Sequence, residues 1–285
     1  MSAPHSSAYL YRPMTTDDLP AAHALSVQLK WPHRLEDWAM LQRVSDGFVV
    51  LDGERLIGTA FACPQGDFAT IGLVIVSDDY QGKGIGRKLM EHALGACQAR
   101  TPMLNATLAG APLYASQGFV EFGRIQQHQG HALAPVPSPL ADSEECRPLR
   151  AEDQAPVLEL ANAGSGMDRR AVLNDLLPVV EHSVGIVRDG ELRAFALLRP
   201  FGRGRCIGPV VAESLEQAQH LIAVLLGQVP DAFVRIDTPT NSGLGDWLEA
   251  AGLKQIDTVA QMARGTPPQA ANGVQQFALA TQAVG

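Results

Sequence analysis

Residues 71–90 read Ile71-Gly72-Leu73-Val74-Ile75-Val76, then Ser77-Asp78-Asp79-Tyr80, then Gln81-Gly82-Lys83-Gly84-Ile85-Gly86-Arg87-Lys88-Leu89-Met90. The opening apolar run is bounded by polar residues, which is typical of a buried strand. The closing residues continue into Ala93 and Leu94 at the spacing of an amphipathic helix. The segment therefore predicts a strand, a glycine-rich turn and a helix.

The glycine-rich turn has the composition of a phosphate-binding loop. Glycines allow the backbone to approach a ligand closely and to adopt conformations that side chains forbid. The free N–H groups and the positive end of the following helix suit an anion. Lys83, Arg87 and Lys88 add positive charge at the same place. The sequence therefore predicts a pyrophosphate site, and an ordinary helix-entry turn is the structural alternative.

Two common phosphate motifs do not fit this turn. A P-loop requires Ser or Thr after its Gly-Lys pair, but Gly84 follows Lys83. A dinucleotide-binding fingerprint that starts at Gly82 would require its last glycine where Arg87 stands. The pattern that fits is Gln-x-x-Gly-x-Gly, formed by Gln81, Gly84 and Gly86.

That pattern resembles the coenzyme A loop of the GNAT superfamily of N-acetyltransferases. A second segment, Leu113-Tyr114-x-x-x-Gly118-Phe119, resembles another motif of the family. The resemblance implies that acetyl-CoA is the cosubstrate and that it is bound by Val74, Ile75, Val76, Gln81, Gly82, Lys83, Gly84, Ile85, Gly86 and Arg87. In one departure, Thr107 stands where family members often have Asn, which puts contacts from that position in doubt.

The chain contains an internal repeat. Tyr11-Arg12-Pro13 recurs as Cys146-Arg147-Pro148, Asp52-Gly53 as Asp189-Gly190, and Gly118-Phe119 as Gly252-Leu253. In each copy the Asp-Gly pair lies between two apolar runs and predicts a β-hairpin. Matches that recur at a nearly constant offset indicate a duplicated domain.

We therefore expect a mixed α/β (α+β) fold made of two tandem GNAT domains, each a mostly antiparallel sheet with flanking helices. The boundaries are residues 1–130 for the first copy, 131–144 for a Pro-rich linker and 145–285 for the second copy. In the first copy the expected strands are 9–14, 47–52, 55–63, 68–76, 102–107 and 119–127, and the expected helices are 17–29, 34–44, 84–98 and 111–117.

The second copy lacks the glycine loop. Ala212-Glu213-Ser214-Leu215-Glu216-Gln217 stands in its place, with two carboxylates that would repel an anion. Ser214 and Gln217 have the spacing of a capping box, in which side chains satisfy the free N–H groups of a helix start. Trp247 stands near the position of Tyr114. We infer that the second copy is degenerate and has lost coenzyme A binding.

The resemblance implies direct attack of an amine on the acetyl thioester. Backbone groups of Val74, Ile75 and Val76 are the candidates to stabilise the oxyanion. Tyr114 is the candidate catalytic acid, because a phenol is protonated at neutral pH and can donate to a thiolate. No general base is evident; Asp67 or a chain of water molecules could serve.

Residues 31–38 read Trp31-Pro32-His33-Arg34-Leu35-Glu36-Asp37-Trp38, an unusual concentration of aromatic and basic residues. The run resembles one in bacterial two-domain acetyltransferases, and it lies between the first two expected helices, where the family places substrate-selecting residues. We expect Trp31, His33 and Trp38 to form a substrate wall. The alternative is that both tryptophans belong to the core.

Composition limits the partners. The net charge of −8 over 285 residues argues against a nucleic-acid partner and is compatible with an amine substrate. The polar N-terminus and the short apolar runs predict no membrane association. The four isolated cysteines indicate a reducing, cytoplasmic setting, and the histidines show no metal-ligand spacing. The oligomeric state stays open between a monomer, whose two copies form a pseudo-dimer, and a homodimer.

The expected function is transfer of an acetyl group from acetyl-CoA to the primary amine of a small molecule or peptide. One alternative is a non-catalytic, acyl-CoA-binding regulatory module. An interaction scaffold without any cofactor is a third possibility.

Overall fold

The computed structural model describes residues 9–285. The first half contains strands β1 (Leu10–Pro13), β2 (Asp46–Asp52), β3 (Arg55–Gln65), β4 (Phe68–Val76), β5 (Thr101–Ala106) and β6 (Val120–His131). Its helices are α1 (Leu19–Gln28), α2 (Leu35–Val44), α3 (Ile85–Cys97) and α4 (Ala111–Ala115), with short 3₁₀ turns at Thr16–Asp18 and Asp78–Tyr80. The predicted order of elements in this half is confirmed, and most boundaries agree within one or two residues.

The second half repeats this order. Its strands are β7 (Glu144–Pro148), β8 (His182–Arg188), β9 (Glu191–Phe201), β10 (Gly204–Ala212), β11 (Phe233–Pro239), β12 (Lys254–Ala263) and β13 (Gln275–Ala278). Its helices are α5 (Gln154–Ser165), α6 (Arg170–Leu176), α7 (Leu215–Gln228) and α8 (Gly245–Ala250), with 3₁₀ turns at Ala151–Asp153, Leu177–Val179 and Thr240–Ser242. The expected mixed α/β fold, with a mostly antiparallel sheet and flanking helices, is confirmed.

One repeated sequence landmark has a clear structural cause. The guanidinium of Arg12 forms two hydrogen bonds of 2.7 Å with the carboxylate of Asp18, and this pairing lowers the pKa of Asp18 to about 2. Arg147 and Asp153 form the same pair in the second half, at 2.7 and 2.9 Å. In both halves the pair ties the first strand to the start of the first helix.

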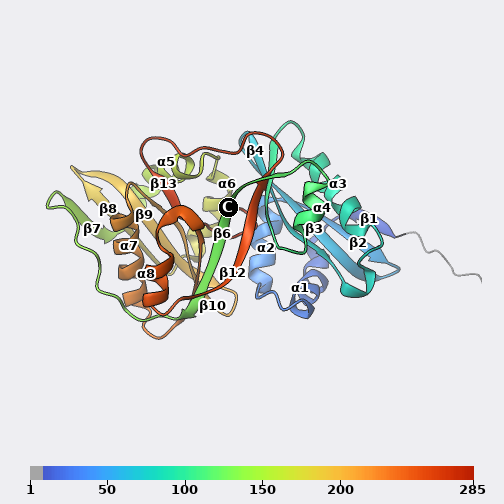
Figure 1. Cartoon of the computed structure of the whole chain (residues 1–285), viewed down its shortest axis with the longest axis horizontal. Coiled ribbons are helices and arrows are strands. Elements are labelled where there is room, and N and C mark those ends of the chain that lie inside the picture. Colours follow the sequence, from blue (N-terminus) through green and yellow to red (C-terminus); the bar gives the residue numbers. More distant parts are fainter. Residues whose placement is uncertain (1–8) are drawn as a thin grey trace, which may run out of the picture.

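The two halves exchange strands. One 13-stranded sheet runs in the order β1-β2-β3-β4-β5-β12-β6-β11-β10-β9-β8-β7, and β13 pairs with β10. Strand β12 of the second half therefore lies beside β5, and β6 of the first half lies beside β11. Both cross the centre of the molecule between its two lobes (Figure 1). The boundaries drawn from the sequence repeat thus do not separate two independent sheets.

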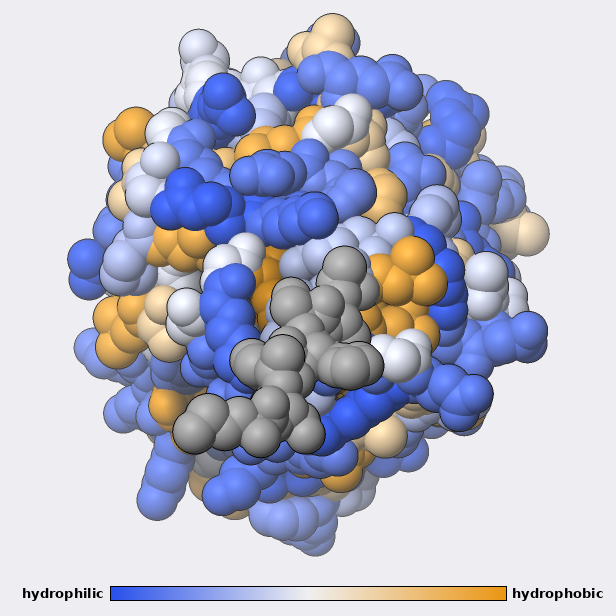
Figure 2. All heavy atoms as spheres, turned by 90° about the vertical axis from the view of Figure 1, so that its right-hand side faces the viewer, coloured by the Kyte–Doolittle hydropathy of each residue, from blue (hydrophilic) through white to orange (hydrophobic). Residues whose placement is uncertain are grey.

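The hydrophobic core also joins the halves. Helix α3 packs on one face of the first half, with Leu89 and Met90 buried against strand residues. On the opposite face α1 and α2 bury Trp38 in a cluster that also contains Val172 from α6 and Val284 from the C-terminal segment. The outer face of the first half is mostly hydrophilic, with small separate groups of apolar residues (Figure 2). None of the helices in residues 9–285 has the length and apolar composition needed to cross a bilayer.

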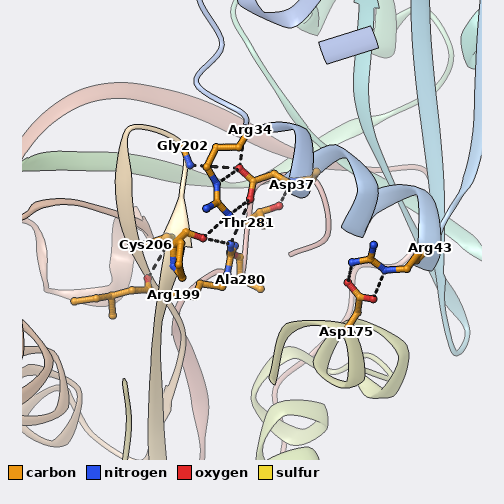
Figure 3. A network of polar contacts seen from close by, with 12 residues as sticks. Arg34, Asp37, Arg43, Asp175, Arg199, Gly202, Cys206, Ala280 and Thr281 are labelled. Atoms are coloured by element: carbon orange, nitrogen blue, oxygen red, sulfur yellow. Dashed lines mark hydrogen bonds and ion pairs between the residues drawn. The ribbon is translucent and has the colours of Figure 1, made fainter. Parts of the chain in front are cut away.

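The run from Trp31 to Trp38 connects the two halves at a buried polar interface. Arg34 donates to Asp37 at 2.9 Å and to the carbonyl of Pro200 at 3.0 Å. The buried Asp37 carboxylate also accepts from the backbone N–H of Gly202 at 3.3 Å and lies 4.0 Å from the guanidinium of Arg199. Figure 3 shows this network beside a separate ion pair between α2 and α6, in which Arg43 Nε lies 2.6 Å from Asp175 Oδ1.

The strand exchange predicts a single unfolding transition. Each half completes its sheet with a strand from the other, so neither can lose its structure alone. Under native conditions, slowly exchanging amides of Val50 in the first half and Leu221 in the second should open with the same free energy, measured by hydrogen exchange. Two separate denaturant transitions, each confined to one half, would contradict this expectation.

His33 should make the stability of the protein depend on pH. Its ring packs edge-on against Phe201, and burial, together with the nearby charge of Arg235, lowers its pKa from 6.5 to about 4. As the pH falls from 6.5 to 4, the unfolded chain takes up this proton before the folded one does. The histidine should therefore reduce the free energy of unfolding by up to roughly 3 kcal/mol over that range.

This loss can be measured by urea denaturation at a series of pH values. His33→Gln removes the proton uptake, so its free energy of unfolding should fall less steeply between pH 6.5 and 4 than that of the wild type. His131→Gln, at an exposed histidine, is the matched control. Equal slopes for wild type and His33→Gln would show that His33 is not the group responsible.

Candidate functional site

A cleft opens where two parallel strands diverge. Strand β4 pairs with β5 only from Phe68 to Ile71, opposite Thr101 to Leu104. Beyond that point β5 is held by β12 on its other edge, with Asn105 paired to Gln261 and Ala106 to Ala260. The edge of β4 that faces the gap is left without a strand partner among residues 9–285.

The cleft holds a cavity of about 700 Å³. Five segments line it: the residues just after α1, the second half of β4, the stretch from Tyr80 through the glycine loop into the start of α3, the end of β5 with the turn that follows it, and α4. Its lining residues are Leu29, Trp31, Ile71, Gly72, Leu73, Val74, Ile75, Val76, Tyr80, Gln81, Gly82, Gly84, Ile85, Gly86, Arg87, Asn105, Thr107, Ala109, Gly110, Leu113 and Tyr114.

A bulge interrupts β4 beside the cavity. Leu73 adopts a φ of 46°, in the left-handed region, and the register against β3 shifts there. The buried hydroxyl of Thr59 donates to the carbonyl of Leu73 at 2.8 Å, which stabilises the unusual backbone. Val74, Ile75 and Val76, for which the sequence predicts backbone contacts with a ligand, follow the bulge and line the cavity. A free strand edge of this kind can pair with an extended ligand that carries amide groups.

The glycine loop leaves the N-terminus of α3 open. Gly82 and Gly84 have φ values of 74° and 78°, and a Cβ at either position would meet no other atom within 4 Å. No side chain of residues 9–285 caps this helix. Its first N–H groups therefore remain available for an anion beside the cavity. Gln81, Gly82, Gly84, Ile85, Gly86 and Arg87 all line it.

Lys83, which the sequence predicts to bind the cofactor with the rest of the loop, does not line the cavity. Its ammonium group donates to the carbonyl of Asp79 at 3.1 Å and lies 4.7 Å from the centre of the Tyr80 ring. The side chain is thus held on the outside of the loop. Arg87 lines the cavity and also donates to Ser116 Oγ at 3.3 Å.

Tyr114 lies in the wall of the cavity, on α4. Its ring packs edge-on against Phe119, with ring centres 6.2 Å apart, and only 8% of the residue is exposed. Burial raises the pKa of the phenol to about 12, so the hydroxyl carries its proton at neutral pH. Thr107 also lines the cavity, and its hydroxyl accepts from the N–H of Gly110 at 3.2 Å.

The predicted substrate wall is only partly present. Trp31 lines the cavity together with Leu29. Trp38 does not: it is fully buried among core residues, and its indole donates to Ser26 Oγ at 3.2 Å. His33 does not line the cavity either, because it packs against Phe201 at the interface between the halves. The placement of His33 and Trp38 in a substrate wall is therefore wrong.

Two further differences concern polar residues. Asp67 lies in the turn before β4, at the end of the strand away from the glycine loop, and is not part of the lining. Asn105, which the sequence reasoning missed, lies in the wall at the point where β4 and β5 part. A polar residue within the apolar stretch from Pro102 to Ala106 was the available signal.

In the second half the equivalent cleft is filled by the chain itself. Strand β10 pairs with β11 only at Arg205 and Cys206, and β13 then pairs with β10 from Val210 to Ala212. The backbone N–H of Leu279 donates to the carbonyl of Asp237 on β11 at 2.9 Å. In the second half, the segment that contains β13 therefore fills the space beside β10. The equivalent space beside β4, in the first half, stays open.

The start of α7 is also closed to an anion. Ser214 Oγ accepts from the backbone N–H of Gln217 at 3.3 Å, and the Gln217 side chain accepts from the N–H of Glu213 at 2.9 Å. The predicted cap is thus present, with its second bond going to the residue before Ser214. Arg188 pairs with Glu213 and Glu144 in the same place.

Comparisons with known proteins agree with this architecture. Family models described as acetyltransferase (GNAT) domains match residues 44–121 and 157–278. The uncharacterized N-acetyltransferase YitH of Bacillus subtilis is 29% identical over 197 residues, which span 67% of this chain and 68% of that protein.

Solved structures share the fold over at least nine tenths of the chain. A putative acetyltransferase from Pyrococcus horikoshii superposes with a TM-score of 0.78 and 18% identity, covering 100% of this chain and 99% of that one. A tandem GNAT protein from the clavulanic acid biosynthesis pathway gives a TM-score of 0.64 and 17% identity, covering 90% and 99%. With a family domain in each half and this fold throughout, the chain belongs to the GNAT acetyltransferase family and is a tandem member of it.

Proposed function

We propose that this protein transfers an acetyl group from acetyl-CoA to the primary amine of a small molecule or peptide, in the cleft of the first half. The observation that carries the proposal is the continuity between an open strand edge and an uncapped helix start. Val74 to Val76 supply the edge, and Gly82 to Gly86 supply the helix start. The four free cysteine thiols of the protein suit a reducing compartment such as the cytoplasm.

The residues present fit coenzyme A. Its pyrophosphate matches the free N–H groups at the start of α3, with Arg87 nearby. Its pantetheine arm carries two amides and could pair with β4 much as β13 pairs with β10. When bound, acetyl-CoA supplies an acyl thioester that an amine can attack.

The chain's own groups then have defined tasks. Backbone groups of β4 beyond the bulge at Leu73 are positioned to stabilise negative charge on the thioester oxygen. Tyr114 holds a proton that it can give to the departing thiolate. The burial that raises the pKa of the phenol makes Tyr114 a weaker acid, but it also disfavours an unprotonated thiolate beside it, and this second effect favours transfer of the proton to sulfur.

Acetyl-CoA should stabilise the wild-type protein, and Gly86→Asp should abolish that effect. At a hundred times the dissociation constant, the ligand adds about 2.7 kcal/mol to the free energy of unfolding. An aspartate at position 86 would lie in the first turn of α3, where an acidic residue suits the helix dipole but repels a pyrophosphate. A Cβ there would come no closer than 3.4 Å to Leu113.

The measurement is thermal unfolding with and without acetyl-CoA. Gly95→Asp, on the same helix with no atom within 4 Å of its Cβ position, is the matched control and should keep the shift. No shift in the wild type would exclude acetyl-CoA binding and would favour a scaffold without cofactor. A normal shift in Gly86→Asp would place the pyrophosphate elsewhere.

Tyr114→Phe should slow the reaction without weakening acetyl-CoA binding. Loss of a general acid typically costs about 10²–10⁴ in rate. We expect amine-dependent release of coenzyme A, followed with a thiol reagent, to fall by a factor in this range, while the thermal shift with acetyl-CoA is retained. Tyr80→Phe is the control, since Tyr80 lines the same cavity but its hydroxyl donates to Asp52 at 2.8 Å.

The same assay separates catalysis from regulation. A regulatory module would bind acetyl-CoA, with the same thermal shift, but would release no coenzyme A with any amine. Full activity in Tyr114→Phe would remove Tyr114 from the mechanism but would leave the transferase function standing.

A further inference from the structure

Asn105 occupies the point at which β4 and β5 separate. The last pair between these strands joins Ile71 to Leu104, so Gly72 and Asn105 are the first residues on either side of the gap. The neighbours of Asn105, Leu104 and Ala106, are buried in the cluster under α3. Because side chains alternate along a strand, Asn105 projects to the opposite face, where Leu29 and Trp31 pack against the cluster of α1 and α2.

The orientation of the Asn105 amide follows from one hydrogen bond. Its Nδ2 donates to the backbone carbonyl of Gln282 at 2.7 Å. A carbonyl can only accept, so the nitrogen must face Gln282 and the oxygen must face away. Asn105 Oδ1 is buried and has no hydrogen-bond partner among residues 9–285. Buried acceptors are normally satisfied, so this one indicates a donor supplied from outside the chain.

Gln282, whose carbonyl accepts the hydrogen bond from Asn105, is fixed by contacts with the second half. Gln282 Nε2 donates to Asp237 Oδ1 at 3.1 Å, and the buried guanidinium of Arg169 donates to the carbonyl of Gly285 at 2.6 Å. Ala283 packs so closely beneath β4 that a Cβ at Gly72 would lie 2.8 Å from its side chain. The C-terminal segment therefore fixes the Asn105 amide before any ligand binds.

We propose that Asn105 positions the acceptor: its Oδ1 accepts a hydrogen bond from the attacking amine, and Leu29 and Trp31 select an amine carried on an apolar body. The proposal rests on the proposed transferase function. The glycine loop lies at the far end of β4, beyond the bulge, so Asn105 lies at the end of the cavity away from the residues that would hold the pyrophosphate. Leu29, Trp31 and Asn105 all line the cavity, and Asn105 does so where β4 and β5 part.

Asn105 would orient the amine without taking its proton. As the new C–N bond forms and the C–S bond breaks, one N–H of the amine stays bonded to Oδ1 and the other proton leaves to solvent. Tyr114 protonates the departing sulfur and regains a proton from solvent. The net change moves one proton from nitrogen to sulfur, so no other reactant is required.

The test compares acceptors and variants in the full-length protein. The acceptors are 2-phenylethylamine, glycinamide and spermidine, each assayed by release of coenzyme A at saturating acetyl-CoA. We expect the highest kcat/KM with 2-phenylethylamine. Trp31→Ala should reduce the ratio of kcat/KM for 2-phenylethylamine to kcat/KM for glycinamide, because that substitution removes apolar contact without touching the amine.

Asn105→Leu keeps the approximate shape of the side chain and removes its polar atoms. We expect kcat/KM for the amine to fall about tenfold, the factor of one lost hydrogen bond, with KM for acetyl-CoA unchanged. Asn105→Asp retains an oxygen at this position but gives it a negative charge. It should therefore raise kcat/KM for spermidine relative to kcat/KM for 2-phenylethylamine. Gln261 is the strand neighbour of Asn105 on β12 and does not line the cavity, so Gln261→Ala, which removes its side-chain amide, is the matched control.

The outcomes separate the two proposals. If Asn105→Leu raises KM for acetyl-CoA and leaves the acceptor constants alone, Asn105 binds the pantetheine arm and the inference is wrong, although the transferase function stands. Unchanged kinetics in Asn105→Leu, or no preference for 2-phenylethylamine in the wild type, would also overturn it. If the wild type uses none of the amines although acetyl-CoA binds, the proposed function fails and this inference fails with it.

Discussion

The pairing of β12 with β5 is the constraint on which the site depends. A strand that leaves its neighbour exposes backbone groups that must find other partners. Here β5 can turn away from β4 after Leu104 because β12 supports its opposite edge, from Met103 to Ala106. The cavity between β4 and β5 is therefore created by a strand that the second half contributes. The second half therefore helps to build the cavity of the first, even though its own cleft is closed.

The two halves show two solutions to the same structural problem. Each has a pair of parallel strands that separate, and each leaves a strand edge that needs hydrogen-bond partners. Beside β10 the partner is β13, while within the described part of the chain the edge of β4 has no strand partner and the helix start next to it has no side-chain cap. After filling the second cleft, the same segment runs on to Gln282 and Ala283, which lie beneath the first. The chain thus uses its last residues to close one site and to shape the other.

The features that could be predicted from the sequence are those set by neighbouring residues. The glycine loop, the two hairpins and the cap at Ser214 each depend on a few adjacent positions, and the structure contains all of them. The strand exchange depends on pairing between residues as distant as Asn105 and Gln261, which no local pattern records. A sequence repeat also suggests two separate units. It shows that two segments are similar, but it does not show which strands are joined by hydrogen bonds. The error at Trp38 had a local remedy, since Trp38, Leu41 and Val44 have the spacing of a buried helix stripe.

The strand exchange also affects how the protein is made. Ala106 ends β5, whereas Ala263, which ends its partner β12, is 157 positions later (263 − 106). At ribosomal rates of roughly 5–20 residues per second, the edge of β5 waits on the order of ten to thirty seconds for that partner. During synthesis the first half therefore carries an unpaired edge that could join a strand of another nascent chain. We therefore expect this protein to depend on chaperones during translation more than its modest size suggests.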